Sequence, residues 1–461
     1  MKIKQLSNSY ESLLDSEVQV SGWVLTSRSQ KDITFIKLND GSDANGVQLI
    51  ADSSIPELIS INTGTSLTAV GTLVKSPAEG QPFEIKVKTI QVLGTTQLDD
   101  YPLAKGKMPL DYLRNYAHLR TRTSSFGSIF RIKSAISQAT NKFFMERGYL
   151  HINPNIVTVN ECEGGAGVFQ LTELDISDNS KLPLVKGTTK YNWSEDHFGK
   201  PAYLTVSSQL QLEALACSLG SVYTTNKSFR SEHSSTNKHL SEFEHLEIED
   251  IFISLDDLMQ IGEDYIKFVG RYLLDNCQED INNLGKFVSK GLLDRVKSIV
   301  DAKFHRVKYS EAIEILQKAT TLSNPVVYGE DLCSEFENYL TEHFKGPVFV
   351  SHWPIAIKSF YMKQCDDLVT CENFDLLMPY KVGELIGGSM REDNLQKMLN
   401  IMEKKGVNSE PLQFYLDLRK FGSVPHGGFG LGLDRMCMMF TGMESIKDVV
   451  AFPVYYKNCN Y

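Results

Sequence analysis

The chain has 461 residues, of which 42% are hydrophobic and 23% are charged. This length exceeds that of a typical single domain, so we expect about two or three compact units, each with enough apolar residues for a core. No stretch is apolar enough to span a bilayer, and the first residues contain no hydrophobic run suited to a secretion signal. We therefore expect a cytoplasmic protein without a membrane partner. The net charge of -10 argues against a uniformly basic nucleic-acid-binding surface.

The charge is unevenly distributed along the chain. Residues 99–133 carry seven basic and three acidic side chains, a local balance of +4. A basic strip of this kind can bind phosphates while the remaining surface stays acidic. A solvated linker would show the same composition, and the strip taken alone favours that interpretation.

The eight cysteines are scattered and never form a CxxC pair; Cys365 and Cys371 are the closest two. A zinc site of the usual kind requires paired ligands, and no second pair is available. We interpret the cysteines as buried free thiols.

The N-terminal part of the chain has the pattern of a small β-barrel. Five β-branched, partly alternating segments are separated by Gly, Asp and Asn, at residues 18–24, 33–38, 46–50, 66–70 and 83–87. Five strands in this length predict a closed barrel of the OB type, a common oligonucleotide binder, although an SH3-like barrel would leave a similar pattern. We assign residues 1–98 to this barrel and residues 99–125 to a basic hinge or linker.

Residues 126–461 have a different pattern, in which helices and strands are mixed. Apolar residues at helical spacing from Phe126 predict a helix that stops at Gly148. A second helix is predicted to begin after Ser207 or Ser208 and to end near Gly220, and a third to run from Ser254 towards Cys277. The final third mixes helices with glycine-rich strand ends, so we predict an α+β domain whose strands carry the polar residues.

One hairpin contains residues suited to binding a nucleotide. Arg230 and Glu232 are two residues apart and share one face of a strand, and Phe243, Glu247 and Glu249 follow on a second strand after a polar loop. Such a hairpin can offer a cation to a phosphate and an aromatic face to a base. A surface hairpin with salt bridges is the alternative for either strand alone.

A second segment, residues 425–435, contains glycines that alternate along a strand. Their spacing fits neither GxGxxG nor a P-loop. Alternating glycines predict a flat surface on which a planar ligand can lie, and the helix that follows places Arg435 near its N-terminus. A glycine-rich turn is by itself a weak signal.

Taken together, these segments resemble motifs 2 and 3 of the class II aminoacyl-tRNA synthetases, and residues 143–154 resemble motif 1 with its proline. The N-terminal part resembles the anticodon-binding barrel of the subclass for Asp, Asn and Lys, through Gly22, Trp23, Val24, Arg28, Phe35, Asp40 and Gln48. The three motifs occur in order, and the resemblance covers nearly the whole chain. It implies a catalytic domain built on an antiparallel sheet with flanking helices, ATP and tRNA as substrates, and a homodimer formed through motif 1.

The resemblance assigns the hairpin and the glycine-rich segment to ATP. Arg230 would bind the α-phosphate and stabilise the charge that develops during adenylate formation. Phe243 and Arg435 would cover the two faces of adenine. Glu232 and His239 would hold the bent nucleotide at its base and phosphate ends. Arg230 and Arg435 are therefore the implied catalytic residues.

Two further groups of residues follow from the same resemblance. Asp375 and Glu384 resemble the carboxylates that hold Mg²⁺ against the phosphates, with a structural salt bridge as the alternative. Arg28, Phe35 and Gln48 would bind the anticodon, Phe35 by stacking on a base and Gln48 by reading a base edge. The alternative for Phe35 is a place in the barrel core.

Other positions bear on which amino acid is bound. Arg391 would read the substrate side chain in both Asp and Asn enzymes, and Glu163 and Gln209 would contact the α-amino end. Aspartyl enzymes have a lysine where this chain has Leu212 and usually an aspartate where it has Glu247. Without the lysine, a carboxylate in a dry pocket would lose its partner, whereas Glu247 could accept a hydrogen bond from an amide nitrogen. The resemblance therefore favours asparagine.

The implied reaction has two steps. The α-carboxylate of asparagine attacks the α-phosphorus of ATP and releases pyrophosphate, and the terminal adenosine hydroxyl of the tRNA then attacks the adenylate and releases AMP. The alternatives are an aspartyl enzyme, including one that charges both tRNAs, a synthetase-like asparagine synthetase, and a non-catalytic paralogue. The chain departs from the family pattern at Lys238, at Glu244, in the loop that contains Tyr380 and Lys381, and at its C-terminus.

Overall fold

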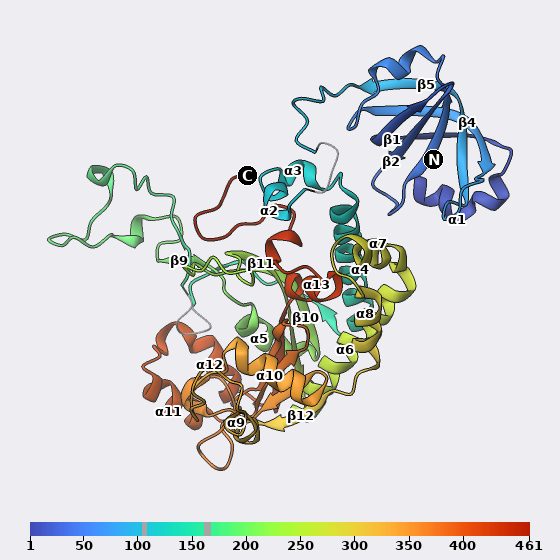
Figure 1. The fold of residues 1–461 in the computed structure, drawn as a ribbon. Helices are drawn as coiled ribbons and strands as arrows, with labels where there is room; N and C mark the ends of the chain where they lie inside the picture. The colour runs from blue at the N-terminus through green and yellow to red at the C-terminus, as the bar shows by residue number, and fades with distance from the viewer. Residues whose placement is uncertain (104–107, 161–166) are drawn as a thin grey trace. The chain divides into compact units, whose positions relative to one another are not determined.

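The computed structural model describes residues 1–103, 108–160 and 167–461 (Figure 1). The chain divides into two compact units. The first contains Met1–Ile132 and Glu279–Lys290, and the second contains Lys133–Gln278 and Gly291–Tyr461. The predicted barrel and linker lie in the first unit, and motifs 2 and 3 lie in the second.

The first unit contains the predicted barrel, which is closed in the order β1-β2-β3-β5-β4. Its strands are β1 (Glu17–Gln30), β2 (Ile33–Asn39), β3 (Val47–Asp52), β4 (Ser66–Lys75) and β5 (Phe83–Gly94). Alternation sends every second side chain inward, as Thr34, Ile36 and Leu38 show on β2. A helix that the sequence analysis did not predict, α1 (Ile3–Leu13), packs Ile3 and Leu6 into the barrel core.

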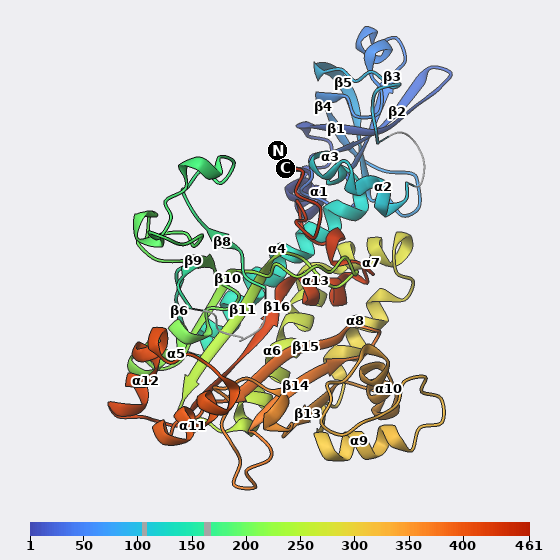
Figure 2. The ribbon, with the colours of Figure 1, turned by 90° about the vertical axis from the view of Figure 1, so that its left-hand side faces the viewer.

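The second unit is built on an eight-stranded sheet within the described residues, in the order β12-β13-β14-β15-β16-β11-β10-β6. The pairs β12–β13 and β10–β6 at the two edges are parallel, and the pairs between them are antiparallel. Figure 2 shows β16 between β11 and β15. The strands are β6 (Leu150–His151), β10 (Val222–Phe229), β11 (Glu242–Ile251), β12 (His305–Lys308), β13 (Val348–Ser351), β14 (Asn373–Met378), β15 (Gly383–Met390) and β16 (His426–Gly432).

A small second sheet has the order β7-β9-β8, with β7 (Val157–Thr158), β8 (Gln170–Leu171) and β9 (Ala202–Leu204). Between β8 and β9 the chain makes a long excursion away from the large sheet (Figure 1, Figure 2). Short 3-10 helices occur at Pro56–Ser60, Asn179–Lys181, Trp193–Glu195, Ile355–Ile357, Glu410–Leu412 and Ile446–Asp448.

Two helix ends coincide with residues that the sequence marks as helix signals. In α6 (Leu255–Asn276), Ser254 is the N-cap and forms a capping box with Asp257, and in α5 (Gln209–Leu219), Gly220 is the C-cap with φ +91°. The other helices are α2 (Leu110–Arg114), α3 (Ala117–Arg120), α4 (Ser124–Glu146), α7 (Gln278–Phe287), α8 (Leu292–Asp301), α9 (Tyr309–Gln317), α10 (Ser334–Phe344), α11 (Leu395–Lys405), α12 (Gln413–Lys420) and α13 (Leu433–Thr441).

The interpretation of the cysteines as buried free thiols is only partly correct. The seven cysteines in the described residues are free, but Cys333 and Cys459 are exposed, whereas Cys277, Cys371 and Cys437 are buried. The exposed pair lies outside the helices and strands, where the apolar periodicity that marks a core position does not apply. No helix in the described part of the chain combines the length and the apolar character that crossing a membrane requires.

Candidate active site

The centre of the large sheet forms the floor of the site. Strand pairing places Asp375, Gly387, Gly430 and Glu247 in one row across β14, β15, β16 and β11. Directly paired residues of antiparallel strands project to the same side of a sheet. The two carboxylates therefore stand on one face with two glycines between them, and these glycines leave space above the sheet.

The glycines of β16 are explained by the side chains that lie over them. A Cβ atom at Gly428 would lie 2.5 Å from Glu249 Cδ and 2.0 Å from the carbonyl oxygen of Ile248, and one at Gly430 would lie 2.6 Å from His245 Nε2. At Gly432 an added Cβ would meet only Arg435 Cβ, at 3.7 Å. The flat surface predicted from the sequence is therefore open at Gly432, whereas a side chain lies close to the backbone at Gly428 and at Gly430.

This difference predicts the effects of two alanine substitutions on stability. Gly428→Ala is expected to lower the free energy of unfolding by about 1–3 kcal/mol, because the backbone oxygen that it meets cannot move aside. Gly432→Ala is the matched control and should unfold like the parent protein, since its new methyl group makes an ordinary contact. Urea unfolding of both variants measures the difference, and equal stability would contradict this account of the glycines.

Two adjacent pockets open above this floor. We name them the Arg391 pocket, a cavity of about 350 Å³, and the Arg435 pocket, a cavity of about 280 Å³. They share lining residues, namely Arg230, His245, Glu384, Gly387 and Gly430. Two ligands, one in each pocket, would therefore lie next to each other at these shared residues. We call this boundary the common wall; it contains the Arg230 guanidinium group.

The structure brings most of the predicted site residues together around these pockets. The Arg391 pocket is lined by Gln209, Glu247, Asp375 and Arg391, the Arg435 pocket is lined by Glu232, His239, Phe243 and Arg435, and both are lined by Arg230 and Glu384. Glu163 falls in residues 161–166 and lies outside the described residues. Arg28, Phe35 and Gln48 are in the barrel of the first unit.

Arg391 is held by acidic partners. Its Nε donates to Glu249 Oε2 at 3.3 Å, its Nη2 donates to Glu249 Oε1, and its Nη1 donates to Ser389 Oγ at 2.7 Å. Burial raises the pKa of Glu249 to about 7, although Arg391 opposes that shift. Glu249 was expected on this hairpin strand, but no role was predicted for it. Glu249 lies two residues after Glu247 and therefore on the same strand face, and this position could have indicated a place at the site.

Glu247 has a different environment from Glu249. Its carboxylate accepts from Ser207 Oγ and, at 2.9 Å, from the backbone N–H of Ser208, so it fixes the chain just before α5. Leu212, where aspartyl enzymes have a lysine, is fully buried in an apolar cluster with Ala216 and Val222. It is not among the residues that line the Arg391 pocket.

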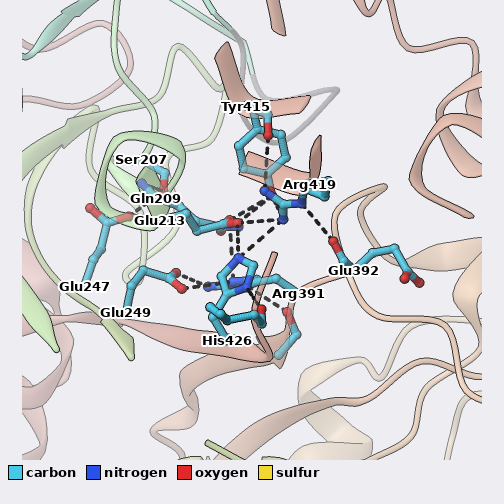
Figure 3. A network of polar contacts seen from close by, with 12 residues as sticks. Ser207, Gln209, Glu213, Glu247, Glu249, Arg391, Glu392, Tyr415, Arg419 and His426 are labelled. Atoms are coloured by element: carbon cyan, nitrogen blue, oxygen red, sulfur yellow. Dashed lines mark hydrogen bonds and ion pairs between the residues drawn. The ribbon is translucent and has the colours of Figure 1, made fainter. Parts of the chain in front are cut away.

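A fully buried carboxylate, Glu213, accepts hydrogen bonds from segments that are distant in the sequence (Figure 3). Glu213 accepts from Tyr415 Oη at 2.7 Å, Arg419 Nη2 at 2.9 Å, His426 Nε2 at 3.0 Å and Gln209 Nε2 at 2.9 Å. Burial alone would raise the pKa of Glu213, but Arg419 and His426 hold it well below its usual range. No role was predicted for Glu213 from the sequence.

The Arg435 pocket combines aromatic and cationic groups. The Arg230 guanidinium lies over the Phe243 ring, 5.4 Å from its centroid, and Arg435 Nη1 donates to the carbonyl oxygen of Glu384 at 2.6 Å. Glu232 Oε2 lies 3.9 Å from His239 Nε2 at the same pocket. The pocket can therefore accept a planar base and negatively charged groups together.

Asp375 and Glu384 meet above Gly387. A Cβ atom at Gly387 would lie 3.7 Å from Asp375 Oδ1 and 3.1 Å from Glu384 Oε1, so both oxygens face the same space. Asp375 Oδ2 accepts from Lys358 Nζ at 2.7 Å. Burial raises the pKa of Asp375 to about 7; Glu384 acts in the same direction and Lys358 opposes it. The arrangement fits a hard cation that takes its other ligands from phosphates.

The predicted anticodon residues share the outer surface of the barrel. Arg28 is paired with Phe35 across β1 and β2, and Gln48 is paired with Lys37 across β2 and β3. Phe35 lies between the buried Thr34 and Ile36 and is itself only partly buried. The interpretation of Phe35 as a core residue is therefore wrong, because strand alternation directs it outward.

Comparison with known families agrees with this site. Residues 110–455 match the family of tRNA synthetases class II (D, K and N), and residues 18–93 match the OB-fold nucleic acid binding domain. The chain belongs to the class II tRNA synthetases for aspartate, lysine and asparagine. The predicted enzyme class and the predicted fold are confirmed.

Individual relatives resemble the chain over nearly its full length. It is 42% identical to the asparagine–tRNA ligase of Protochlamydia amoebophila over 98% of both chains, and 43% identical to that of Geotalea uraniireducens over 95% and 94%. Among solved structures, the asparaginyl-tRNA synthetase of Pyrococcus horikoshii complexed with asparaginyl-adenylate has a TM-score of 0.84 at 29% identity, with 97% of both chains covered. That of Entamoeba histolytica with asparaginyl-adenylate has a TM-score of 0.82 at 27% identity, with the same coverage.

Proposed function

We propose that the protein ligates asparagine to its tRNA in an ATP-dependent reaction with an asparaginyl-adenylate intermediate. The observation that carries this proposal is the common wall of the Arg391 and Arg435 pockets, where Arg230 faces both. The full-length likeness to asparagine–tRNA ligases supports it, as do two neighbours solved with asparaginyl-adenylate. The prediction of asparagine is thereby confirmed, and the aspartyl and asparagine-synthetase alternatives are not favoured.

The first step takes place at the common wall. Asparagine in the Arg391 pocket directs its α-carboxylate at the α-phosphorus of ATP in the Arg435 pocket. The new carboxylate–phosphorus bond forms as the bond to the bridging oxygen breaks, and pyrophosphate leaves. Arg230 stabilises the negative charge that develops on the phosphoryl oxygens. The remaining contribution is positioning, because the two reactants are held next to each other.

The side-chain amide of asparagine is read by an ion pair. Arg391 donates to the amide oxygen, and Glu249 accepts from the amide nitrogen. We give this acceptor role to Glu249 rather than to Glu247, because Glu249 is paired with Arg391, which donates to the amide oxygen, whereas Glu247 accepts from Ser207 and Ser208. Glu247 remains on the pocket wall beside Gln209, where both serve the α-ammonium group.

ATP is held by the residues of the Arg435 pocket. Phe243 stacks on one face of adenine and Arg435 covers the other, while Glu232 and His239 orient the ends of the nucleotide. Arg435 is positioned for this by its hydrogen bond to the backbone of Glu384. The arrangement of these side chains is compatible with the ATP-binding roles that the resemblance to class II synthetases implies.

Mg²⁺ would be held by the two oxygens above Gly387, from Asp375 and Glu384. When bound, it would neutralise part of the phosphate charge. Lys358 already partners the other oxygen of Asp375, so it keeps that carboxylate oriented. Within the described residues, no group of three or more His, Cys, Asp and Glu side chains could hold a metal ion.

In the second step, the terminal adenosine hydroxyl of the tRNA attacks the carbonyl carbon of the adenylate, and AMP leaves. We assign recognition of the anticodon to the outer barrel surface, where Phe35 stacks on a base and Gln48 reads a base edge, with Arg28 beside them. The match of residues 18–93 to an OB-fold nucleic acid binding domain supports this assignment.

The homodimer and the cytoplasmic location remain predictions. Apolar side chains near motif 1 favour the dimer: Met145 is 68% exposed and Leu150 47% exposed, and β6 is an edge strand of the described sheet. Sedimentation of the purified protein should give a mass of about twice 51.9 kDa.

Pyrophosphate exchange with asparagine and aspartate in parallel assays tests the function. We expect exchange that depends on asparagine and is far weaker with aspartate. Stimulation by aspartate alone would overturn the assignment of the amino acid. Stimulation by neither amino acid would favour the non-catalytic paralogue.

The preference for asparagine should depend on pH. Burial raises the pKa of Glu249 to about 7, so this residue gains a proton and loses its negative charge as the pH falls through that value. The aspartate side chain stays ionised in the same range, and a neutral Glu249 repels it less. Between about pH 8 and about pH 6 the ratio of asparagine to aspartate exchange should therefore fall roughly several-fold. A ratio that stays constant would exclude this role for Glu249.

A further inference from the structure

The buried carboxylate of Glu213 does not line either pocket, yet it contacts two residues that do. It accepts from Gln209 and lies 3.6 Å from Nε of Arg391. On its other side are Tyr415, Arg419 and His426, which belong to the segment from α12 to the start of β16 (Figure 3). Glu213 therefore connects the substrate pocket with a separate polar cluster.

We propose that Glu213 is a specificity-determining positioning residue, which makes the Arg391 pocket prefer a neutral side chain by cancelling the positive charge of Arg419. The inference rests on the proposed function. It concerns the selection of asparagine over aspartate and leaves the chemistry of adenylate formation to the groups described above.

The formal charges of the buried groups carry this inference. Arg391 and Arg419 are cations, and Glu249 and Glu213 are anions, so these four groups together carry no net charge. All four are at most 4% exposed, so bulk water screens them weakly. Asparagine leaves the balance unchanged, whereas aspartate adds a negative charge without a partner.

Loss of the Glu213 charge would give these buried groups a net positive charge. Arg419 would then leave one positive charge in excess near the pocket, and Arg391 would lose one of its two acidic neighbours. An aspartate side chain would neutralise the excess, and asparagine could not. The effect on aspartate should therefore be opposite in sign to the effect on asparagine, which a general loosening of the pocket would not produce.

The geometry also explains why these partners surround Glu213. A buried carboxylate is destabilising unless donors satisfy its oxygens. Tyr415 donates to both oxygens, Arg419 and His426 donate to one, and Gln209 donates to the other. The charge of Glu213 is thus maintained next to the substrate pocket without contact with the substrate.

Glu213→Gln tests the proposal, because it removes the charge and keeps the size of the side chain. The measurement is kcat/KM for pyrophosphate exchange by the full chain, with asparagine and with aspartate. We expect the ratio of the two values to fall roughly tenfold or more, as one unit charge at this range and an effective dielectric constant of about 20 implies. Aspartate exchange should rise in absolute terms.

Three companion variants separate charge from structure. Glu213→Asp keeps the charge while it disturbs the geometry, and it should keep the asparagine preference better than Glu213→Gln does. Arg419→Gln removes the cation and leaves one negative charge in excess, so it should sharpen the preference for asparagine. Glu392→Gln is the matched buried control, since the Glu392 carboxylate accepts from Gln364 and Asn394 and points away from Glu213 (Figure 3).

The outcomes are distinguishable. A parent enzyme without asparagine-dependent exchange would refute the proposed function itself. An active parent whose Glu213→Gln variant loses asparagine and aspartate exchange equally would refute the role of Glu213 alone. If Glu213→Gln does not fold, Arg419→Gln decides: a ratio of asparagine to aspartate exchange that falls or stays unchanged would overturn the proposal, and a higher ratio would support it.

Discussion

Replacement of Arg230 by glutamine should lower asparagine-dependent pyrophosphate exchange by roughly 10²–10³-fold. Arg230 lines both pockets at their common wall, so it is placed where charge develops on the α-phosphate. The loss should appear mainly in kcat, because the interaction strengthens as the transition state forms. Affinity for asparagine should change little, since the Arg391 pocket retains its other lining residues.

The experiment compares Arg230→Gln with Arg271→Gln, an exposed arginine on α6 that lines neither pocket. The control should exchange pyrophosphate at the parent rate. Thermal unfolding of both variants separates a catalytic loss from a folding defect. An Arg230→Gln protein that folds and exchanges at the control rate would exclude the transition-state role.

The second large effect concerns Arg391 and combines stability with substrate binding. Arg391→Met leaves Glu249 buried without its main cation and removes one of the cations near Glu213. Removal of one partner from a buried ion pair costs about 3–5 kcal/mol. We therefore expect the free energy of unfolding to fall by about this amount, and asparagine exchange to be lost even where the protein is folded.

Two comparisons test that account. Lys420→Met breaks an exposed ion pair with Asp417, and it should change the free energy of unfolding by less than about 1 kcal/mol. Adding Glu249→Gln to Arg391→Met should recover part of the lost stability, because it removes the unpaired charge, while asparagine exchange stays absent. Equal destabilisation by Arg391→Met and Lys420→Met, in urea unfolding, would show that the buried pair contributes no more than an exposed one.

The elements that were predicted well have strong local signals. The β-branched alternation of residues 18–87 encodes the barrel strands, and the capping residue Ser254 and the terminator Gly220 set helix ends. Helix α1 was not predicted, because its sequence is largely polar and only Ile3 and Leu6 are buried. A short helix of that kind is stabilised by the barrel it packs on, which no local pattern reveals.

The candidate site also combines residues that local motifs identify with residues that only the tertiary structure brings together. Arg230, Phe243 and Arg435 lie in segments whose motifs are contiguous, and the structure places them at one pocket. Leu212 was predicted to distinguish asparagine from aspartate enzymes, because of its position in a motif. It lies in an apolar cluster and is not among the residues that line the Arg391 pocket. On a helix, adjacent residues point in different directions, so the neighbouring Glu213 reaches the polar network instead.

The sequence by itself determined the class of protein, the two-part architecture and the type of reaction, because these follow from motifs that are continuous in the chain. Only the tertiary structure decided which charges meet. Arg391 binds Glu249 across 142 residues, and Arg419 binds Glu213 across 206. Electrostatic interaction depends on distance in space and on burial, and neither quantity is written in the spacing of residues along the chain.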